Sequence, residues 1–174
     1  MVSIISEFTS YLSSPLGDLE VSATEEYISS IHFVESTKRP SPRKLSTEYV
    51  PDSIHELTFQ LEEYFAGKRK TFDIAFKQEG TAFQQLVWKE LENIPFGKTI
   101  SYLELSRRIG NEKAIRAVGT TNGLNQMSLI VPCHRVIGSN GSLVGYGGDL
   151  WRKKWLLAHE AKVSGSYQME LFGN

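Results

Sequence analysis

The hydrophobic pattern of the chain changes near residue 78, and this change most restricts the folds that the sequence can adopt. Before it, the segments 6–13, 18–24 and 27–34 are rich in β-branched and aromatic residues and are separated by short turns, which is typical of antiparallel strands. After it, apolar residues recur at helical spacing. We therefore predict an α+β protein with two domains, residues 1–78 and 79–166, and a tail at 167–174.

The first domain is expected to be a small antiparallel sheet with one helix. In segment 18–24, Leu19, Val21 and Ala23 alternate with polar residues, so one face of that strand should be buried. Residues 36–51 contain three prolines and four basic residues, which indicates an irregular connection. A helix is predicted from an N-cap at Asp52 or Ser53 to Gly67, followed by a strand at 71–76.

The second domain is expected to be mostly helical. Thr81 and Gln84 have the spacing of a capping box that opens a helix ending about residue 93, and Ser101 and Glu104 repeat that spacing. A third helix is predicted over residues 112–122 with Asn111 as its cap. The second and third helices are joined by a tight turn at Gly110, which favours a helix-turn-helix arrangement, although many such pairs are only packing units.

The segment Pro132-Cys133-His134-Arg135 contains the only cysteine of the chain. The apolar run 129–131 before it predicts a buried strand or extended segment that holds Cys133 in place. The thiolate is the nucleophilic form of cysteine, and a neighbouring histidine with a carboxylate partner can generate it at neutral pH. A lone intracellular cysteine is more often a small buried apolar residue, so the cysteine alone leaves both interpretations open.

Composition and charge limit the function classes. One cysteine allows no internal disulfide and no multi-cysteine zinc site, and it fits a reducing compartment, so we expect a cytoplasmic protein. Neither a signal peptide nor a membrane span is visible. Residues 1–78 carry 8 basic and 12 acidic residues, a balance of −4, whereas residues 79–166 carry 11 and 7, a balance of +4. The basic half fits a polyanionic partner and an ordinary solvated surface equally well.

Two further side chains, considered without the rest of the sequence, each allow a functional and a purely structural interpretation. Arg116 lies within a predicted helix whose neighbours Ala114, Ala117 and Gly119 are small, so this surface can approach a nucleic-acid backbone closely. A solvated or ion-paired arginine is the simpler explanation. Tyr102 would ordinarily be a core aromatic residue whose hydroxyl reaches a polar partner.

Motifs spread over residues 83–160 resemble those of one known family in order and spacing. They are Ile94-Pro95-Phe96-Gly97, Ile100-Ser101-Tyr102, Arg116-Ala117-Val118-Gly119, Asn122-Gly123, Ile130 to Ile137, Gly145-Tyr146-Gly147-Gly148 and Trp155 to Glu160. The chain resembles the O6-alkylguanine-DNA alkyltransferases, the methylated-DNA–protein-cysteine methyltransferases. The resemblance implies a ribonuclease H-like first domain and a winged helix-turn-helix-like second domain.

The resemblance implies repair of alkylated DNA in a single step. A monomer would bind double-stranded DNA through the minor groove, flip the damaged nucleotide, and transfer the alkyl group from O6-alkylguanine, and also O4-alkylthymine, to Cys133. His134 would take the thiol proton through a water, and Glu160 would orient the histidine. Because a thioether is not hydrolysed, each molecule would act once, as a suicide enzyme that needs no cofactor and no metal.

The resemblance also assigns roles to other positions. Arg116 would fill the gap in the base stack, and Tyr102 would hydrogen-bond the flipped guanine. Asn125 would brace the active-site turn, and the carbonyl of Val136 would accept from the guanine amino group. The remaining implied positions are the wall of the alkyl pocket at Tyr146, Gly147 and Gly148, and the small DNA-facing residues Ala114, Ala117 and Gly119.

The sequence departs from the family pattern at Gln126, where a proline usually follows the asparagine. We expect altered local rigidity and a free backbone N–H there, with the chemistry retained. Two other classes remain as alternatives, a non-transferring protein that only binds alkylated DNA and, more remotely, a thiol-dependent hydrolase. The intact Pro-Cys-His-Arg segment argues against the first of these.

Overall fold

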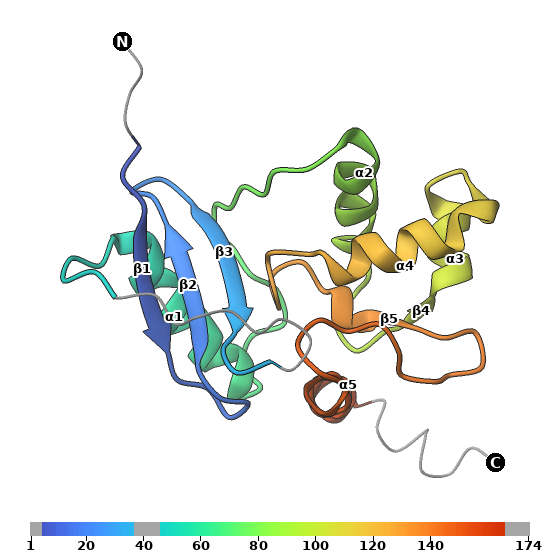
Figure 1. Cartoon of the computed structure of the whole chain (residues 1–174). Helices are drawn as coiled ribbons and strands as arrows, with labels where there is room; N and C mark the ends of the chain where they lie inside the picture. The colour runs from blue at the N-terminus through green and yellow to red at the C-terminus, as the bar shows by residue number, and fades with distance from the viewer. Residues whose placement is uncertain (1–4, 37–45, 166–174) are drawn as a thin grey trace. The chain divides into compact units, whose positions relative to one another are not determined.

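The computed structural model describes residues 5–36 and 46–165, which form two compact units. The first unit ends at Gln78 and also includes Gln126–Ser128, and the second contains the rest of the chain from Glu79 onward. Each unit is described by itself below (Figure 1). The predicted tail at 167–174 and part of the predicted connection at 36–51 lie outside the described residues.

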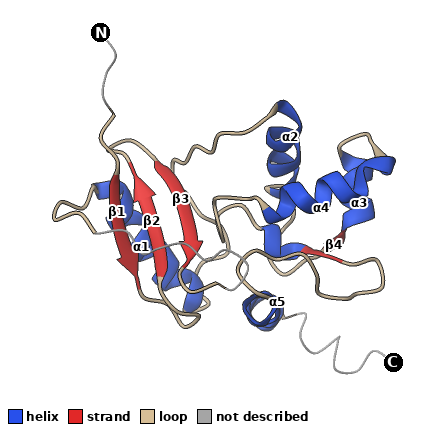
Figure 2. Ribbon diagram, viewed as in Figure 1, coloured by secondary structure: helices blue, strands red, loops and turns tan. Residues whose placement is uncertain are grey.

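The first unit is a three-stranded antiparallel sheet with one helix (Figure 2). Strands β1 (Phe8–Leu12), β2 (Leu19–Ala23) and β3 (Ile28–Phe33) follow one another in the sheet, which confirms the three predicted strands. Helix α1 (Asp52–Phe65) buries an apolar stripe formed by Ile54, Leu57, Leu61 and Tyr64. These side chains and the sheet form the core of the unit.

The predicted face of β2 at Leu19, Val21 and Ala23 is buried. Its polar face is buried as well, where Glu20 accepts a hydrogen bond from the Tyr11 hydroxyl at 2.8 Å. Two other local predictions for this unit were wrong. The N-cap of α1 is Pro51, without a side-chain cap. Residues 71–76 make only a single bridge, between Phe76 and Ile28, and no strand.

The segment 126–128 is bonded to strand β3 of this first unit. The N–H of Ile31 donates to the carbonyl of Gln126 at 2.8 Å, and the N–H of Ser128 donates to the carbonyl of Ile31 at 3.2 Å. The N–H of Gln126, which a proline would lack, donates to the side chain of Gln78 at 3.1 Å. The N–H gained by losing the family's proline is therefore used in a hydrogen bond.

The second unit is mostly helical, as predicted. Helix α2 (Ala82–Leu91) opens with a complete capping box between Thr81 and Gln84. Helix α3 (Tyr102–Arg108) is capped by Ser101, but Glu104 makes no reciprocal cap bond because its carboxylate binds Arg108 at 3.0 Å. The third predicted helix is a 3₁₀ turn, η1 (Glu112–Ala114), followed by α4 (Ile115–Gly123), and Asn111 makes no cap bond.

Two short strands and a last helix complete this unit. Strands β4 (Ile100–Ser101) and β5 (Val136–Ile137) pair in parallel, and helix α5 spans Leu150–Ser164. A second 3₁₀ turn, η2 (Cys133–Arg135), comes directly before β5. Residues 129–131 form a turn and a bend, so the predicted strand or extended segment before Cys133 was wrong, although Leu129 and Val131 are buried as expected. Leu129 has a φ of 74°, which is incompatible with an extended strand.

Candidate active site

The turn that carries Cys133 is held by two buried asparagine side chains. Cys133 is 4% exposed, and its N–H donates to the carbonyl of Val131 at 2.8 Å. Asn125 donates its Nδ2 to the same carbonyl at 2.9 Å, and Asn122 donates its Nδ2 to the carbonyl of Cys133 at 3.2 Å. The main chain on both sides of the thiol therefore has fixed partners.

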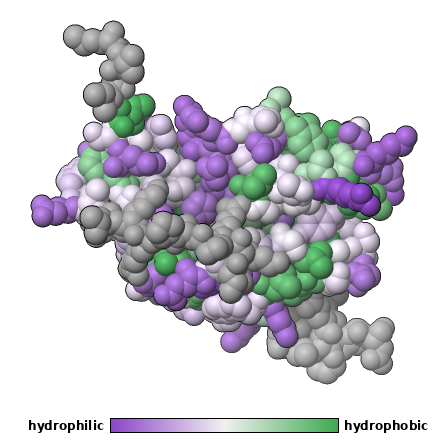
Figure 3. Space-filling view, in the orientation of Figure 1, coloured by the Kyte–Doolittle hydropathy of each residue, from purple (hydrophilic) through white to green (hydrophobic). Residues whose placement is uncertain are grey.

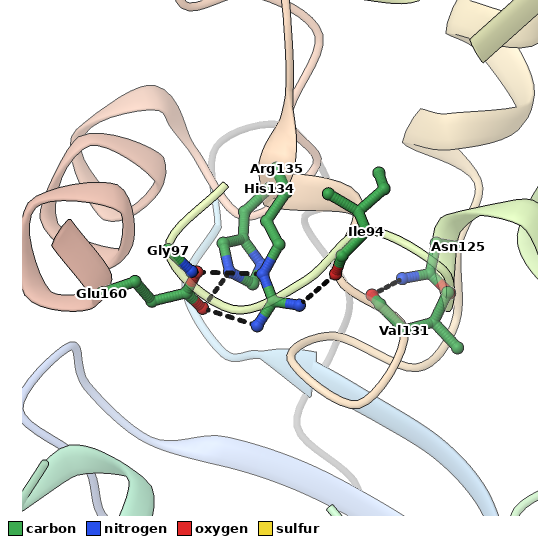
Figure 4. Close-up of polar contacts among 7 residues, drawn as sticks. All are labelled: Ile94, Gly97, Asn125, Val131, His134, Arg135 and Glu160. Atoms are coloured by element: carbon green, nitrogen blue, oxygen red, sulfur yellow. Dashed lines mark hydrogen bonds and ion pairs between the residues drawn. The ribbon is translucent and has the colours of Figure 1, made fainter. Parts of the chain in front are cut away.

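His134 and Glu160 form a hydrogen-bonded pair away from solvent (Figure 4). His134 Nε2 lies 2.8 Å from Glu160 Oε1, and both side chains are at most 1% exposed. Arg135 donates its Nε and Nη2 to the two carboxylate oxygens, each at 2.9 Å. The N–H of Gly97 donates to Glu160 Oε2 at 3.2 Å.

Arg135 also ties this cluster to the loop after α2. Its Nη1 donates to the carbonyl of Ile94 at 2.7 Å. Gly97 lies in the same loop with a φ of 77°, a conformation that favours glycine. The Glu160 carboxylate thus receives donors from a histidine, an arginine and a main-chain N–H, which leaves its position fully determined.

Burial and charge set the protonation states of the pair. Burial would raise the pKa of Glu160, but His134 and Arg135 lower it well below its usual range, so the carboxylate is ionised. Burial lowers the pKa of His134, although Glu160 opposes this shift, so the imidazole is neutral at pH 7. With Nε2–H donating to the carboxylate, the lone pair is on Nδ1. Among residues 5–36 and 46–165, Nδ1 has no hydrogen-bond partner, and it can accept a proton.

Tyr102 and Lys153 bind the same main-chain carbonyl. The Tyr102 hydroxyl donates to the carbonyl of Val144 at 2.7 Å, and Lys153 Nζ donates to it at 2.8 Å. Lys153 Nζ also donates to the carbonyl of Val136 at 2.5 Å. Burial and, to a smaller extent, the negative charge of Cys133 raise the pKa of Tyr102 to about 12. Tyr102 therefore keeps its proton at neutral pH.

Lys153 is a buried cation near the thiol. It is 0% exposed, and burial lowers its pKa to about 8, while the negative charge of Cys133 raises it. This coupling is reciprocal, so the ammonium stabilises the thiolate of Cys133.

Replacing Lys153 by methionine is expected to slow alkylation of Cys133 by iodoacetamide at pH 7 by about tenfold, which corresponds to about one pK unit of lost charge stabilisation. The difference should shrink above pH 8, where Lys153 itself loses its proton. The matched control is Lys154→Met, which changes an exposed lysine one residue later. Equal alkylation rates in both variants at pH 7 would show that Lys153 does not activate the thiol.

The surface of η1 and α4 carries the predicted DNA-facing residues. Arg116 and Ala117 are exposed, and Ala114 and Gly119 are partly exposed. Val118, Thr121 and Asn122 are buried on the other side of α4. Trp88 of α2 donates its Nε1–H to the carbonyl of Thr121 at 2.9 Å, which fixes α4 against α2. Arg116 is thus an exposed arginine on a rigidly held helix.

The loop before α5 carries the predicted pocket residues. Tyr146 and Gly148 are buried, and Gly147 is partly exposed. Gly145 has a φ of 70°, and a Cβ there would lie 2.6 Å from the Tyr102 hydroxyl oxygen. Glycine is therefore required at 145 by conformation and by the close approach of Tyr102.

The structure gathers most of the predicted site residues in the second unit, and it adds residues that the sequence did not single out. The added contacts come from Asn122, Arg135 and Lys153, the carbonyl of Ile94, and the N–H of Gly97. Asn122 was noted as the end of a helix and as part of a family motif, without a role, and Lys153 lies in a run of three basic residues. Neither had a signal in the local sequence that would reveal its burial.

No group of His, Cys, Asp and Glu side chains within 5–36 and 46–165 could hold a metal ion. Nor does any helix in those ranges have the length and apolar character needed to cross a membrane. On the face shown in Figure 3, apolar side chains form separate patches between polar ones.

A buried cysteine followed by a histidine–carboxylate pair, in the same unit as two short helices joined by a tight turn, is the arrangement of a protein that combines a cysteine nucleophile with a helix-turn-helix. Family comparison makes this more specific. Residues 8–78 match the ribonuclease-like domain of 6-O-methylguanine DNA methyltransferase, and residues 82–162 match its DNA-binding domain. The chain belongs to the 6-O-methylguanine DNA methyltransferase family.

Individual relatives agree with this assignment. A methylated-DNA–protein-cysteine methyltransferase of Methanosarcina acetivorans is 43% identical over 154 residues, which cover 84% of this chain and 94% of the relative. The constitutive enzyme of that name from Bacillus subtilis is 38% identical and covers 87% and 93%. A crystal structure of Mycobacterium tuberculosis OGT in complex with DNA has a TM-score of 0.80 and 40% identity, covering 88% of this chain and 92% of that one.

Proposed function

We propose that this protein repairs alkylated DNA by transferring the alkyl group of O6-alkylguanine to Sγ of its own Cys133. It would thus be a methylated-DNA–protein-cysteine S-methyltransferase. The observation that carries the proposal is the residue next to Cys133: neutral His134 donates its Nε2–H to the ionised Glu160, and its Nδ1 has no hydrogen-bond partner among the residues that the structure describes. Family membership and the DNA complex of a relative support DNA as the partner.

The transfer balances without a cofactor. His134 takes the thiol proton, through a water, and the thiolate attacks the alkyl carbon of the lesion. A C–S bond forms as the C–O6 bond breaks, and the electron pair of that bond stays on the guanine. The base then takes up one proton, so the products are unmodified guanine and an S-alkyl cysteine. The single hydroxyl proton of Tyr102 would turn from the Val144 carbonyl, which Lys153 continues to bind, to donate to the leaving base as negative charge develops there.

The DNA-binding mode and the assembly are also part of the proposal. A monomer would approach the minor groove with the exposed surface of η1 and α4, and the damaged nucleotide would flip toward Cys133. The carbonyl of Val136 already accepts from Lys153, but a carbonyl has two lone pairs and can also accept from the guanine amino group. A single reactive thiol fits a reducing, cytoplasmic setting.

Mass spectrometry tests the proposal directly. Incubation with DNA that contains O6-methylguanine should add one methyl group, and peptide mapping should place it on Cys133. Duplex DNA without the lesion is the control and should add nothing. An unmodified Cys133 after incubation with lesion DNA would instead favour a protein that only binds alkylated DNA.

Replacing Arg116 by alanine is expected to slow repair of duplex DNA by about tenfold or more, because nothing would fill the gap left by the flipped base. Reaction with free O6-benzylguanine should change little, since a free base requires no flipping. The matched control is Lys113→Ala, which removes an exposed cation from η1 and should weaken duplex binding only modestly. Equal losses of Arg116→Ala on both substrates would indicate that Arg116 supports the fold or the pocket.

A further inference from the structure

Asn122 is a buried polar side chain for which the mechanism above has no use. It is 1% exposed at the penultimate position of α4. Its Nδ2 donates to the carbonyl of Cys133 at 3.2 Å. The donor end of the amide therefore holds the main chain of the nucleophile.

The acceptor end of the same amide is unmatched. Asn122 Oδ1 has no hydrogen-bond partner within the described ranges 5–36 and 46–165. Leaving a buried amide oxygen unpaired is costly, and buried polar groups are nearly always hydrogen-bonded. An unpaired acceptor on a side chain that bonds the nucleophile's main chain is well explained if its donor arrives with the substrate.

The position of Asn122 fits contact with the flipped base. Its side chain bonds the main chain of Cys133, the residue that attacks the lesion. One turn earlier on α4, a Cβ on Gly119 would lie 3.8 Å from the Tyr102 ring. Gly119 and Asn122 are one turn apart on α4, at the edge between its exposed and buried faces, so we expect the flipped base to enter beside them.

The chemistry of the lesions identifies the missing donor. Alkylation at O6 leaves N1 of guanine without a proton, so the exocyclic 2-amino group is the N–H donor of the damaged base. O4-alkylthymine has no N–H donor on its base. We propose that Asn122 Oδ1 accepts a hydrogen bond from the 2-amino group of the flipped base, and that Asn122 thereby favours O6-alkylguanine over O4-alkylthymine. This inference rests on the proposed function.

The experiment compares two lesions that differ only in the 2-amino group. Single-turnover transfer rates are measured on single-stranded oligonucleotides containing O6-methylguanine or O6-methylhypoxanthine, for the wild type and for Asn122→Leu. The wild type should react faster with O6-methylguanine, and Asn122→Leu should reduce that rate ratio by about 3- to 10-fold, the range of one hydrogen bond. Asn122→Leu also removes the hydrogen bond to the Cys133 carbonyl. This loss should slow transfer from both lesions by the same factor, so it does not change the rate ratio.

Asn125→Leu is the matched control, because Asn125 is a second buried asparagine that holds the same turn. It should slow both lesions and keep the wild-type ratio. An unchanged ratio in Asn122→Leu, or the same decrease in Asn125→Leu, would overturn the inference. If Asn122→Leu fails to fold, Asn122→Ser is measured in its place, and a wild-type ratio near one overturns the inference without any variant. Absence of transfer from both lesions in the wild type would contradict the proposed function itself.

Discussion

Methyl transfer from O6-methylguanine DNA is expected to stop at one group per protein molecule, and Cys133→Ala is expected to transfer none. The thioether formed on Cys133 has no route back to a thiol, because the neighbouring His134–Glu160 pair can move a proton but cannot cleave a C–S bond. Titration of the protein against a molar excess of labelled lesion DNA gives the plateau. This is the largest effect that we expect from any single substitution.

Binding separates the loss of chemistry from the loss of fold in that experiment. Cys133→Ala removes the sulfur but leaves the exposed surface of η1 and α4 unchanged, so its affinity for lesion DNA should stay within about threefold of the wild type. The main-chain bonds of residue 133 to Val131 and Asn122 do not depend on the sulfur. Transfer that continues well beyond one group per molecule would exclude the proposed mechanism.

Most helices and strands of the fold could be predicted from the local sequence. Alternating residues in 18–24 and the capping box at Thr81 are local signals, and the structure contains strand β2 and helix α2 there. The differences occurred where long-range contacts decide. Glu20 is buried and accepts a hydrogen bond from Tyr11 of the neighbouring strand. The N–H of Asp73 donates to the side chain of Gln60 in α1 and not to a neighbouring strand.

The candidate site could be predicted only in part, because its contacts also join residues that are distant in sequence. His134 follows Cys133 directly in the sequence, but only the fold brings Glu160 to within 2.8 Å of that histidine. The resemblance supplied this pairing, whereas residue spacing could not. Arg135 and Lys153 were missed as site residues because a charged side chain is exposed by default, and their burial depends on carbonyls and a carboxylate that are distant in sequence.

Replacing Glu160 by glutamine is expected to slow methyl transfer by at least about 100-fold and to lower the free energy of unfolding by about 3–5 kcal/mol, because buried Arg135 loses its counter-charge. The amide also cannot stabilise an imidazolium on His134. The measurements are single-turnover rates and urea unfolding. The wild-type carboxylate has a lowered pKa, so its contribution is present at neutral pH and is lost as pH falls below about 4.3, the ordinary glutamate value. The Gln variant should lack this acid-sensitive part.

Arg135→Met separates the two roles of Glu160. This variant removes the buried guanidinium and leaves the His134–Glu160 pair in place, so it should lose stability comparably while its folded fraction keeps most of the transfer rate. Both variants must be assayed well below their melting temperatures, so that unfolded protein does not imitate a catalytic defect. A Glu160→Gln variant that is destabilised yet transfers at the wild-type rate would show that Glu160 only anchors Arg135 and the Gly97 loop. A slow Glu160→Gln beside a fast Arg135→Met would assign to Glu160 the stabilisation of charge on His134.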